Sequence, residues 1–121
     1  MSNKKKILIV DDEKMNIMVL AHVLKAHYDI IVAADGASGL AAAEKHWPDL
    51  ILLDIIMPDM DGYEVIGKLK ASETTKEIPV VFISGLHDAD DREKGMSLGA
   101  MDFIMKPFDA SVIKSTIDSY F

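Results

Sequence analysis

Five short runs of consecutive apolar residues recur along the chain and constrain its fold more than any other feature. They are ILIV at 7–10, IIVAA at 30–34, LILL at 50–53, VVFI at 80–83 and the run within DFIM at 102–105. Continuous apolar runs, as opposed to alternating ones, are typical of strands buried on both faces, as in a parallel sheet. The segments between them carry apolar residues at helical spacing. Five strands that alternate with five helices predict an open, doubly wound α/β sheet, which we expect to form one domain over residues 1–121.

The helical segments differ in how well their sequences support a helix. Residues 109–120 carry an apolar stripe that includes Val112, Ile113 and Ile117. The segment 88–98, DADDREKGMSL, is poor in apolar residues and contains a glycine, which predicts a short helix of low local stability. Asp61 is expected to cap the helix that follows it.

The charge balance and the lack of cysteine exclude several classes of protein. Thirteen basic and twenty acidic residues give a net charge of −7, which argues against a general nucleic-acid or anionic-membrane surface. With no cysteine, the chain has no disulfide, thiolate metal site or thiol nucleophile. No apolar run approaches the ~18 residues of a spanning helix, and the start lacks the apolar stretch of a secretory signal. These features predict a soluble, cytoplasmic protein, either complete or cut from a longer one.

Polar residues follow four of the predicted strands at the point where each strand ends. Asp11 and Asp12 follow the first, Asp54 the third, Ser84 the fourth and Lys106 the fifth. In an open α/β sheet the ligand site lies beyond the carboxyl ends of the strands. The sequence therefore predicts that three acids, one hydroxyl and one amine converge on one edge of the sheet.

The residue types at this edge indicate a particular chemistry. Two carboxylates ~4 Å apart repel by about 4 kcal/mol at an effective dielectric near 20, and a cation between them relieves that repulsion. Clustered carboxylates without thiols or paired histidines favour a hard cation, so Mg²⁺ is the expected metal. A carboxylate beside Mg²⁺ is also able to attack phosphorus, with Lys106 neutralising the transferred group and Ser84 donating a hydrogen bond to it.

The segments VDDEKMN, LLDIIMPDMDGYEV, FISG and DFIMKPF resemble the signature segments of the response regulator receiver domain of two-component signalling. The resemblance covers nearly the whole chain. It implies a flavodoxin-like (βα)5 fold with strand order 2-1-3-4-5. It also implies that a sensor histidine kinase or phosphotransfer protein phosphorylates Asp54. Asp12 and Asp54 would bind Mg²⁺ directly, together with the backbone carbonyl of Ile56, and Asp11 would act largely through water.

The same resemblance implies how phosphorylation is read. Lys106 would pair with Asp54 and then with the phosphoryl group, and the Lys106–Pro107 bond is often cis in the family. Ser84 and Phe103 would form the switch, with the aromatic ring turning inward as the hydroxyl moves. The changed face would comprise 88–98, 102–105 and 109–120, and would control homodimerisation or partner binding. The chain would catalyse only its own phosphorylation and dephosphorylation, without binding nucleic acid or membrane directly, alone or within a longer regulator.

Two other classes of protein compete with this interpretation. An aspartate-dependent phosphohydrolase would need a second acid two residues after its nucleophile, where this chain has Ile56. A receiver-like scaffold that is never phosphorylated would not need the intact set of Asp11, Asp12, Asp54, Ser84 and Lys106.

Overall fold

The structure, a computed structural model, describes residues 4–85, 89–106 and 109–121. Strands and helices alternate through these residues, and their bounds are β1 Lys5–Val10, α1 Lys14–Leu24, β2 Tyr28–Ala33, α2 Gly36–His46, β3 Leu50–Asp54, α3 Gly62–Ala71, β4 Val80–Ser84, α4 Ala89–Ser97, β5 Asp102–Met105 and α5 Ala110–Asp118. The strands form one parallel sheet in the order β2-β1-β3-β4-β5. The predicted fold class and strand order are therefore confirmed. Across the described ranges, no helix is long and apolar enough to cross a membrane.

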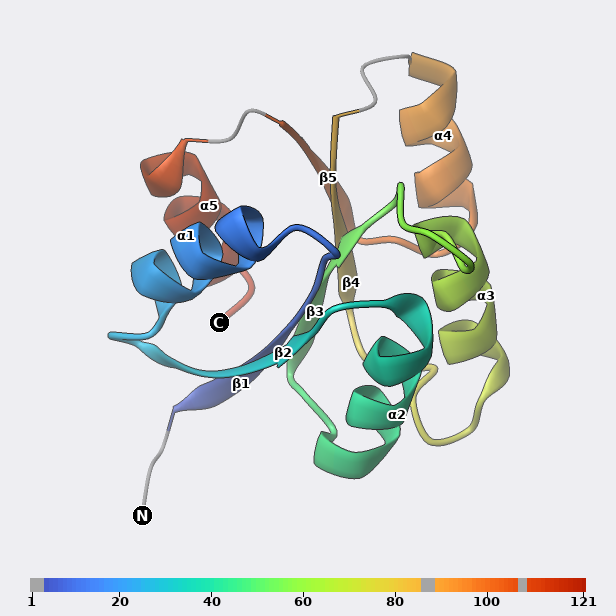
Figure 1. Cartoon of the computed structure of the whole chain (residues 1–121), viewed down its shortest axis with the longest axis horizontal. Coiled ribbons are helices and arrows are strands. Elements are labelled where there is room, and N and C mark those ends of the chain that lie inside the picture. The colour runs from blue at the N-terminus through green and yellow to red at the C-terminus, as the bar shows by residue number, and fades with distance from the viewer. Residues whose placement is uncertain (1–3, 86–88, 107–108) are drawn as a thin grey trace.

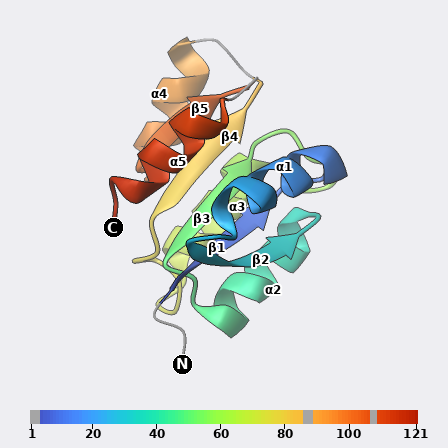
Figure 2. The ribbon, with the colours of Figure 1, turned by 90° about the vertical axis from the view of Figure 1, so that its left-hand side faces the viewer.

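The helices cover both faces of the sheet. Helices α1 and α5 lie on one face, and α2, α3 and α4 lie on the other (Figure 1). Figure 2 shows α1 and α5 in front of the sheet. Successive side chains of a strand point to opposite faces, so a strand between two helical layers needs apolar residues at every position. This explains why the central strands β3 and β4 are buried along their whole lengths.

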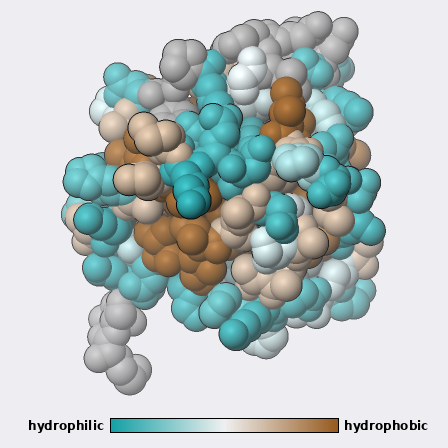
Figure 3. Space-filling view, viewed as in Figure 1, coloured by the Kyte–Doolittle hydropathy of each residue, from teal (hydrophilic) through white to brown (hydrophobic). Residues whose placement is uncertain are grey.

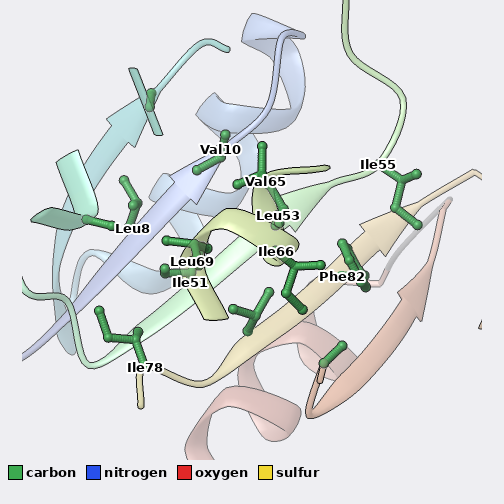
Figure 4. Close-up of a cluster of buried hydrophobic side chains, with 14 of the residues drawn as sticks. Leu8, Val10, Ile51, Leu53, Ile55, Val65, Ile66, Leu69, Ile78 and Phe82 are labelled. Atoms are coloured by element: carbon green, nitrogen blue, oxygen red, sulfur yellow. The ribbon is translucent and has the colours of Figure 1, made fainter. Parts of the chain in front are cut away.

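Two apolar clusters fill the spaces between the sheet and its two helical layers. Ile51 and Leu53 of β3 pack in the cluster beneath α3, while Leu50 and Leu52 of the same strand pack in the cluster beneath α1 and α5. Figure 4 shows the first cluster, in which side chains of α3 meet those of the sheet. The alternation along β3 therefore holds both helical layers in place.

Helices α3 and α5 test two features that the sequence predicts, a capping residue and an apolar stripe. The side chain of Asp61 accepts a hydrogen bond from the backbone N–H of Glu64, which confirms the predicted cap of α3. In α5, Ile113 and Ile117 are buried, but Val112 is 50% exposed. Of the apolar stripe predicted for this helix, Ile113 and Ile117 therefore face the sheet, and Val112 lies beside them toward solvent.

The edge strand β2 leaves apolar surface uncovered. Figure 3 shows apolar side chains along the course of β2 in the view of Figure 1, bordered by both hydrophilic and mildly apolar side chains. Val32 of this strand is 52% exposed. An edge strand has a neighbour on one side only, which accounts for its lower burial than that of β3.

Candidate functional site

The carboxyl ends of β1, β3, β4 and β5 bring the predicted site residues together. Asp11 follows β1, Asp54 and Ser84 are the last residues of β3 and β4, and Lys106 follows β5. The strand order reverses beside β1, so this edge is the point at which an open sheet leaves space for a ligand. The backbone N–H of Lys106 donates to the carbonyl of Ser84 over 2.7 Å, which fixes the end of β5 against β4.

Lys106 lies among the carboxylates. Its Nζ is 3.3 Å from Oδ2 of Asp11 and 3.3 Å from Oδ1 of Asp54. The side chains of Asp11 and Asp54 are 2% and 3% exposed, and that of Lys106 is 17% exposed. Two buried acids thus share one ammonium group, which leaves the cluster with a net negative charge.

The carboxyl group of Asp54 is poorly compensated. Its Oδ1 accepts a hydrogen bond from the N–H of Ile55 over 2.9 Å, in addition to the contact with Lys106. Its buried Oδ2 has no hydrogen-bond partner among the described residues. Burial, assisted by the charge of Asp11, raises the pKa of Asp54 from 3.8 to about 6, although Lys106 and the Ile55 N–H act in the opposite direction. An unsatisfied buried carboxylate oxygen is costly, and such groups often mark functional sites.

The amine of Lys106 remains charged in this environment. Burial alone would lower the pKa of Lys106, but the negative charges of Asp54 and Asp11 outweigh burial and raise it. A positive charge is therefore held against the carboxyl group of Asp54, 3.3 Å from its Oδ1.

The acidic residues at this edge also fit a divalent cation. Asp11, Asp12, Glu13 and Asp54 each offer a carboxylate oxygen, and these oxygens lie within 4.8 Å of one another. Mg²⁺ prefers hard oxygen ligands such as these carboxylates. One oxygen of Asp54 also has no hydrogen-bond partner among the described residues. The residues present therefore fit the metal that the sequence predicts.

Glu13 also belongs to this cluster, although it is not among the site residues expected from the sequence. It occupies the N-cap position of α1, yet its side chain makes no capping hydrogen bond. Its Oε1 lies 4.0 Å from Nζ of Lys106, and its backbone N–H donates to Oδ1 of Asp11. The run of three acids in VDDEKMN was the available signal, but an acid at the start of a helix is also expected because it interacts favourably with the helix dipole.

Ser84 and Phe103, the expected switch residues, are both buried. Ser84 is fully buried at the end of β4, and Phe103 is 4% exposed. The ring of Phe103 lies 6.1 Å from that of Phe82, between centroids. Any rotation of Phe103 that follows phosphorylation therefore starts from an inward position. The Lys106–Pro107 bond lies outside the described residues.

The fold and the site together define an open α/β protein with a carboxylate cluster, paired to one lysine, at the switch edge of its sheet. The family model for the response regulator receiver domain matches residues 7–118. The chain therefore belongs to the receiver domains of two-component response regulators, as the sequence motifs predict.

Known relatives place this assignment in context. Over 94% of its length the chain is 44% identical to the response regulator PleD of Caulobacter vibrioides, of which it covers 25%. It superimposes on the chemotaxis response regulator CheY4 of Vibrio cholerae with a TM-score of 0.92 at 28% identity, covering 98% of this chain and 100% of that one. The chain spans between a quarter and a half of the length of the curated relatives that match it first.

One structural relative carries a metal ion. The receiver domain of the sensor histidine kinase PA1611 from Pseudomonas aeruginosa has a magnesium ion coordinated in its active-site cleft. It shares 27% sequence identity with this chain at a TM-score of 0.88, with 97% of each chain covered. Receiver domains as a family bind Mg²⁺ in the active site.

Proposed function

We propose that Asp54 is the phosphoacceptor of this receiver domain. The observation that carries this proposal is the carboxyl group of Asp54, buried at the end of the central strand. Its Oδ2 has no partner among the described residues, and its Oδ1 lies 3.3 Å from the amine of Lys106. A carboxylate oxygen without a hydrogen-bond donor is available to attack phosphorus. In the transfer, a bond forms between this oxygen and phosphorus, and the bond between phosphorus and the donor's imidazole nitrogen breaks. The donor is a sensor histidine kinase or a phosphotransfer protein.

We assign the metal to the acidic edge of the cluster. Asp12 and Asp54 would hold Mg²⁺ directly with the backbone carbonyl of Ile56, and Asp11 would act largely through water. The exposure of Asp12 and the burial of Asp11 are consistent with these two roles. When bound, Mg²⁺ supplies positive charge that offsets the charge of the transferred group.

The remaining residues stabilise the transferred group and report its presence. Lys106 already contacts Asp54, so its amine is positioned to pair with a phosphoryl oxygen. The hydroxyl of Ser84 would donate to another phosphoryl oxygen, and Phe103 would follow its movement. The surface formed by α4, β5 and α5, the α4–β5–α5 face, would then change and control homodimerisation or partner binding. The domain would act in the cytoplasm and catalyse only its own phosphorylation and dephosphorylation.

Intact mass after incubation with a small acyl phosphate tests this proposal. With Mg²⁺ present we expect the mass to rise by one phosphoryl group, and with a chelator present we expect no rise. The same samples, run on a sizing column, test whether the modified chain dimerises. A chain whose mass stays unchanged in Mg²⁺ would support the scaffold alternative, and continuous release of phosphate from a small phosphoester would support the phosphohydrolase.

A further inference from the structure

Helix α4 is attached to the rest of the protein by few apolar contacts. In its stretch from residue 91 to residue 97, the only buried residue is Gly95. Burial of apolar side chains, which holds the other helices, therefore contributes little to the position of α4. Its position depends on individual contacts, and each of these is a candidate for control of the α4–β5–α5 face.

One side chain of α3 makes two of these contacts. The hydroxyl of Tyr63 donates to the backbone carbonyl of Asp91 in α4 over 3.3 Å. The amine of Lys94, one turn further along α4, lies 4.3 Å from the centroid of the Tyr63 ring. A cation at this distance over an aromatic face is attracted to it. Tyr63 therefore contacts two successive turns of α4.

Tyr63 is also held rigidly next to the phosphoacceptor strand. The preceding residue, Gly62, donates its backbone N–H to the carbonyl of Ile55 over 2.7 Å. A Cβ atom on Gly62 would lie 2.4 Å from the carbonyl oxygen of Asp54, so the start of α3 packs directly on the end of β3. Tyr63 thus contacts α4 from a position that is fixed against Asp54, the residue that we propose is phosphorylated.

A row of aromatic rings lies beneath α4. The ring of Tyr63 meets that of Phe82 edge-on at 5.8 Å between centroids, and Phe82 meets Phe103 at 6.1 Å. A Cβ atom on Gly95 would lie 2.9 Å from the ring of Phe82, so α4 approaches these rings as closely as a glycine permits. A shift of α4 away from this position separates it from Tyr63 and from Phe82 together.

We propose that Tyr63 is a positioning residue that holds α4 against α3 and thereby opposes the displacement of α4 that accompanies phosphorylation. The inference rests on the proposed function in one respect, which is that a phosphoryl group at Asp54 favours a shifted α4. A ligand that binds the shifted state must first break the Tyr63 contacts, and the free energy that this costs lowers its apparent affinity. The stronger these contacts are, the weaker the apparent binding becomes. Removing them has two linked consequences: α4 opens more readily, and the phosphoryl site binds its ligand more tightly.

The test compares the unaltered chain with Tyr63→Phe, using beryllium fluoride with Mg²⁺ as the phosphoryl mimic. Loss of the hydrogen bond to Asp91 is expected to tighten beryllium fluoride binding by about two- to tenfold, the factor that corresponds to one ordinary hydrogen bond. In the chain without the mimic, amide hydrogen exchange in α4 is expected to accelerate by the same factor. Lys94→Gln, a surface change, is expected to act in the same direction by about two- to fivefold.

Tyr28→Phe is the matched control. It also removes a tyrosine hydroxyl that donates a hydrogen bond, in this case to Asp118 at the end of α5, which lies on the other face of the sheet from α4 (Figure 1). We expect it to leave both beryllium fluoride affinity and α4 exchange unchanged. A purely structural role for Tyr63 would accelerate exchange without tightening the binding.

Each result has a definite meaning. Unchanged or weaker beryllium fluoride binding by Tyr63→Phe and Lys94→Gln, with normal binding by the unaltered chain, overturns the role of Tyr63 and leaves the proposed function intact. Failure of the unaltered chain to bind beryllium fluoride in Mg²⁺ overturns the proposed function, and the coupling through Tyr63 with it.

Discussion

Replacing the proposed phosphoacceptor is expected to stabilise the fold. Asp54 is 3% exposed, lies near Asp11 and has one carboxylate oxygen without a partner among the described residues. These features make the ionised form of Asp54 unfavourable in the folded chain. Asp54→Asn removes that charge while keeping nearly the same shape, so the variant should resist denaturation better than the unaltered protein.

The size of the effect follows from the pKa of Asp54, which burial and Asp11 raise from 3.8 to about 6. Between these two values the folded chain binds more protons than the unfolded chain, so stability falls as pH rises through this window. At 1.36 kcal/mol for each unit, the loss above the window is about 3 kcal/mol. Lys106 already opposes the shift, so its ion pair with Asp54 is included in this figure.

Urea denaturation in the presence of a chelator measures this difference. We expect Asp54→Asn to be more stable than the unaltered chain by about 3 kcal/mol near pH 7.5 and by about half a kcal/mol near pH 4. Asp29→Asn, which changes an exposed acid on β2, is the control and should show no such dependence. Mg²⁺ should narrow the difference, because it binds the folded unaltered chain and stabilises it. Equal stabilities at both pH values, or a less stable variant near pH 7.5, would refute the reasoning.

Four further substitutions test the packing and the metal site. Gly62→Ala places a Cβ atom 2.4 Å from the last carbonyl of β3, and urea denaturation should show a loss of about 1–3 kcal/mol. Gly67→Ala in the same helix meets nothing within 4 Å and should be neutral or stabilising by up to about 1 kcal/mol; equal effects at the two glycines would contradict the close contact. Gly95→Ala forces α4 away from Phe82, so amide exchange in α4 should accelerate, and unchanged exchange would disprove the tight approach. Asp12→Ala should weaken Mg²⁺ binding, followed by amide chemical shifts, by about tenfold or more; an unaltered affinity would remove Asp12 from the ligand set.

The fold was predictable from the sequence because a strand that is buried on both faces cannot alternate apolar with polar residues. The runs LILL and VVFI have no polar residue, and they form the two strands that are buried throughout. The convergence of Asp11, Asp54, Ser84 and Lys106 was predictable for a related reason, since the carboxyl ends of parallel strands share one edge. Local sequence and topology together placed these residues without knowledge of any tertiary contact.

The contacts between helices were not predictable in the same way. Gly95 looks like a weakness within a poor helix, yet its missing side chain is what lets α4 lie against Phe82. Tyr63 follows a turn signal and gives no sign that its hydroxyl reaches α4. These outcomes depend on how closely two elements approach, and periodicity along one element carries no information about that distance.

Locating the phosphoryl group within the chain shows which residue accepts it. The chain is incubated with a small acyl phosphate and Mg²⁺, the acyl phosphate on the protein is reduced with borohydride, and the modified residue is identified by peptide mass spectrometry. We expect a single modified residue, Asp54, and no modification in Asp54→Asn. Modification of Asp11 or Asp12 in place of Asp54, or an equal yield in the Asp54→Asn variant, would contradict this expectation.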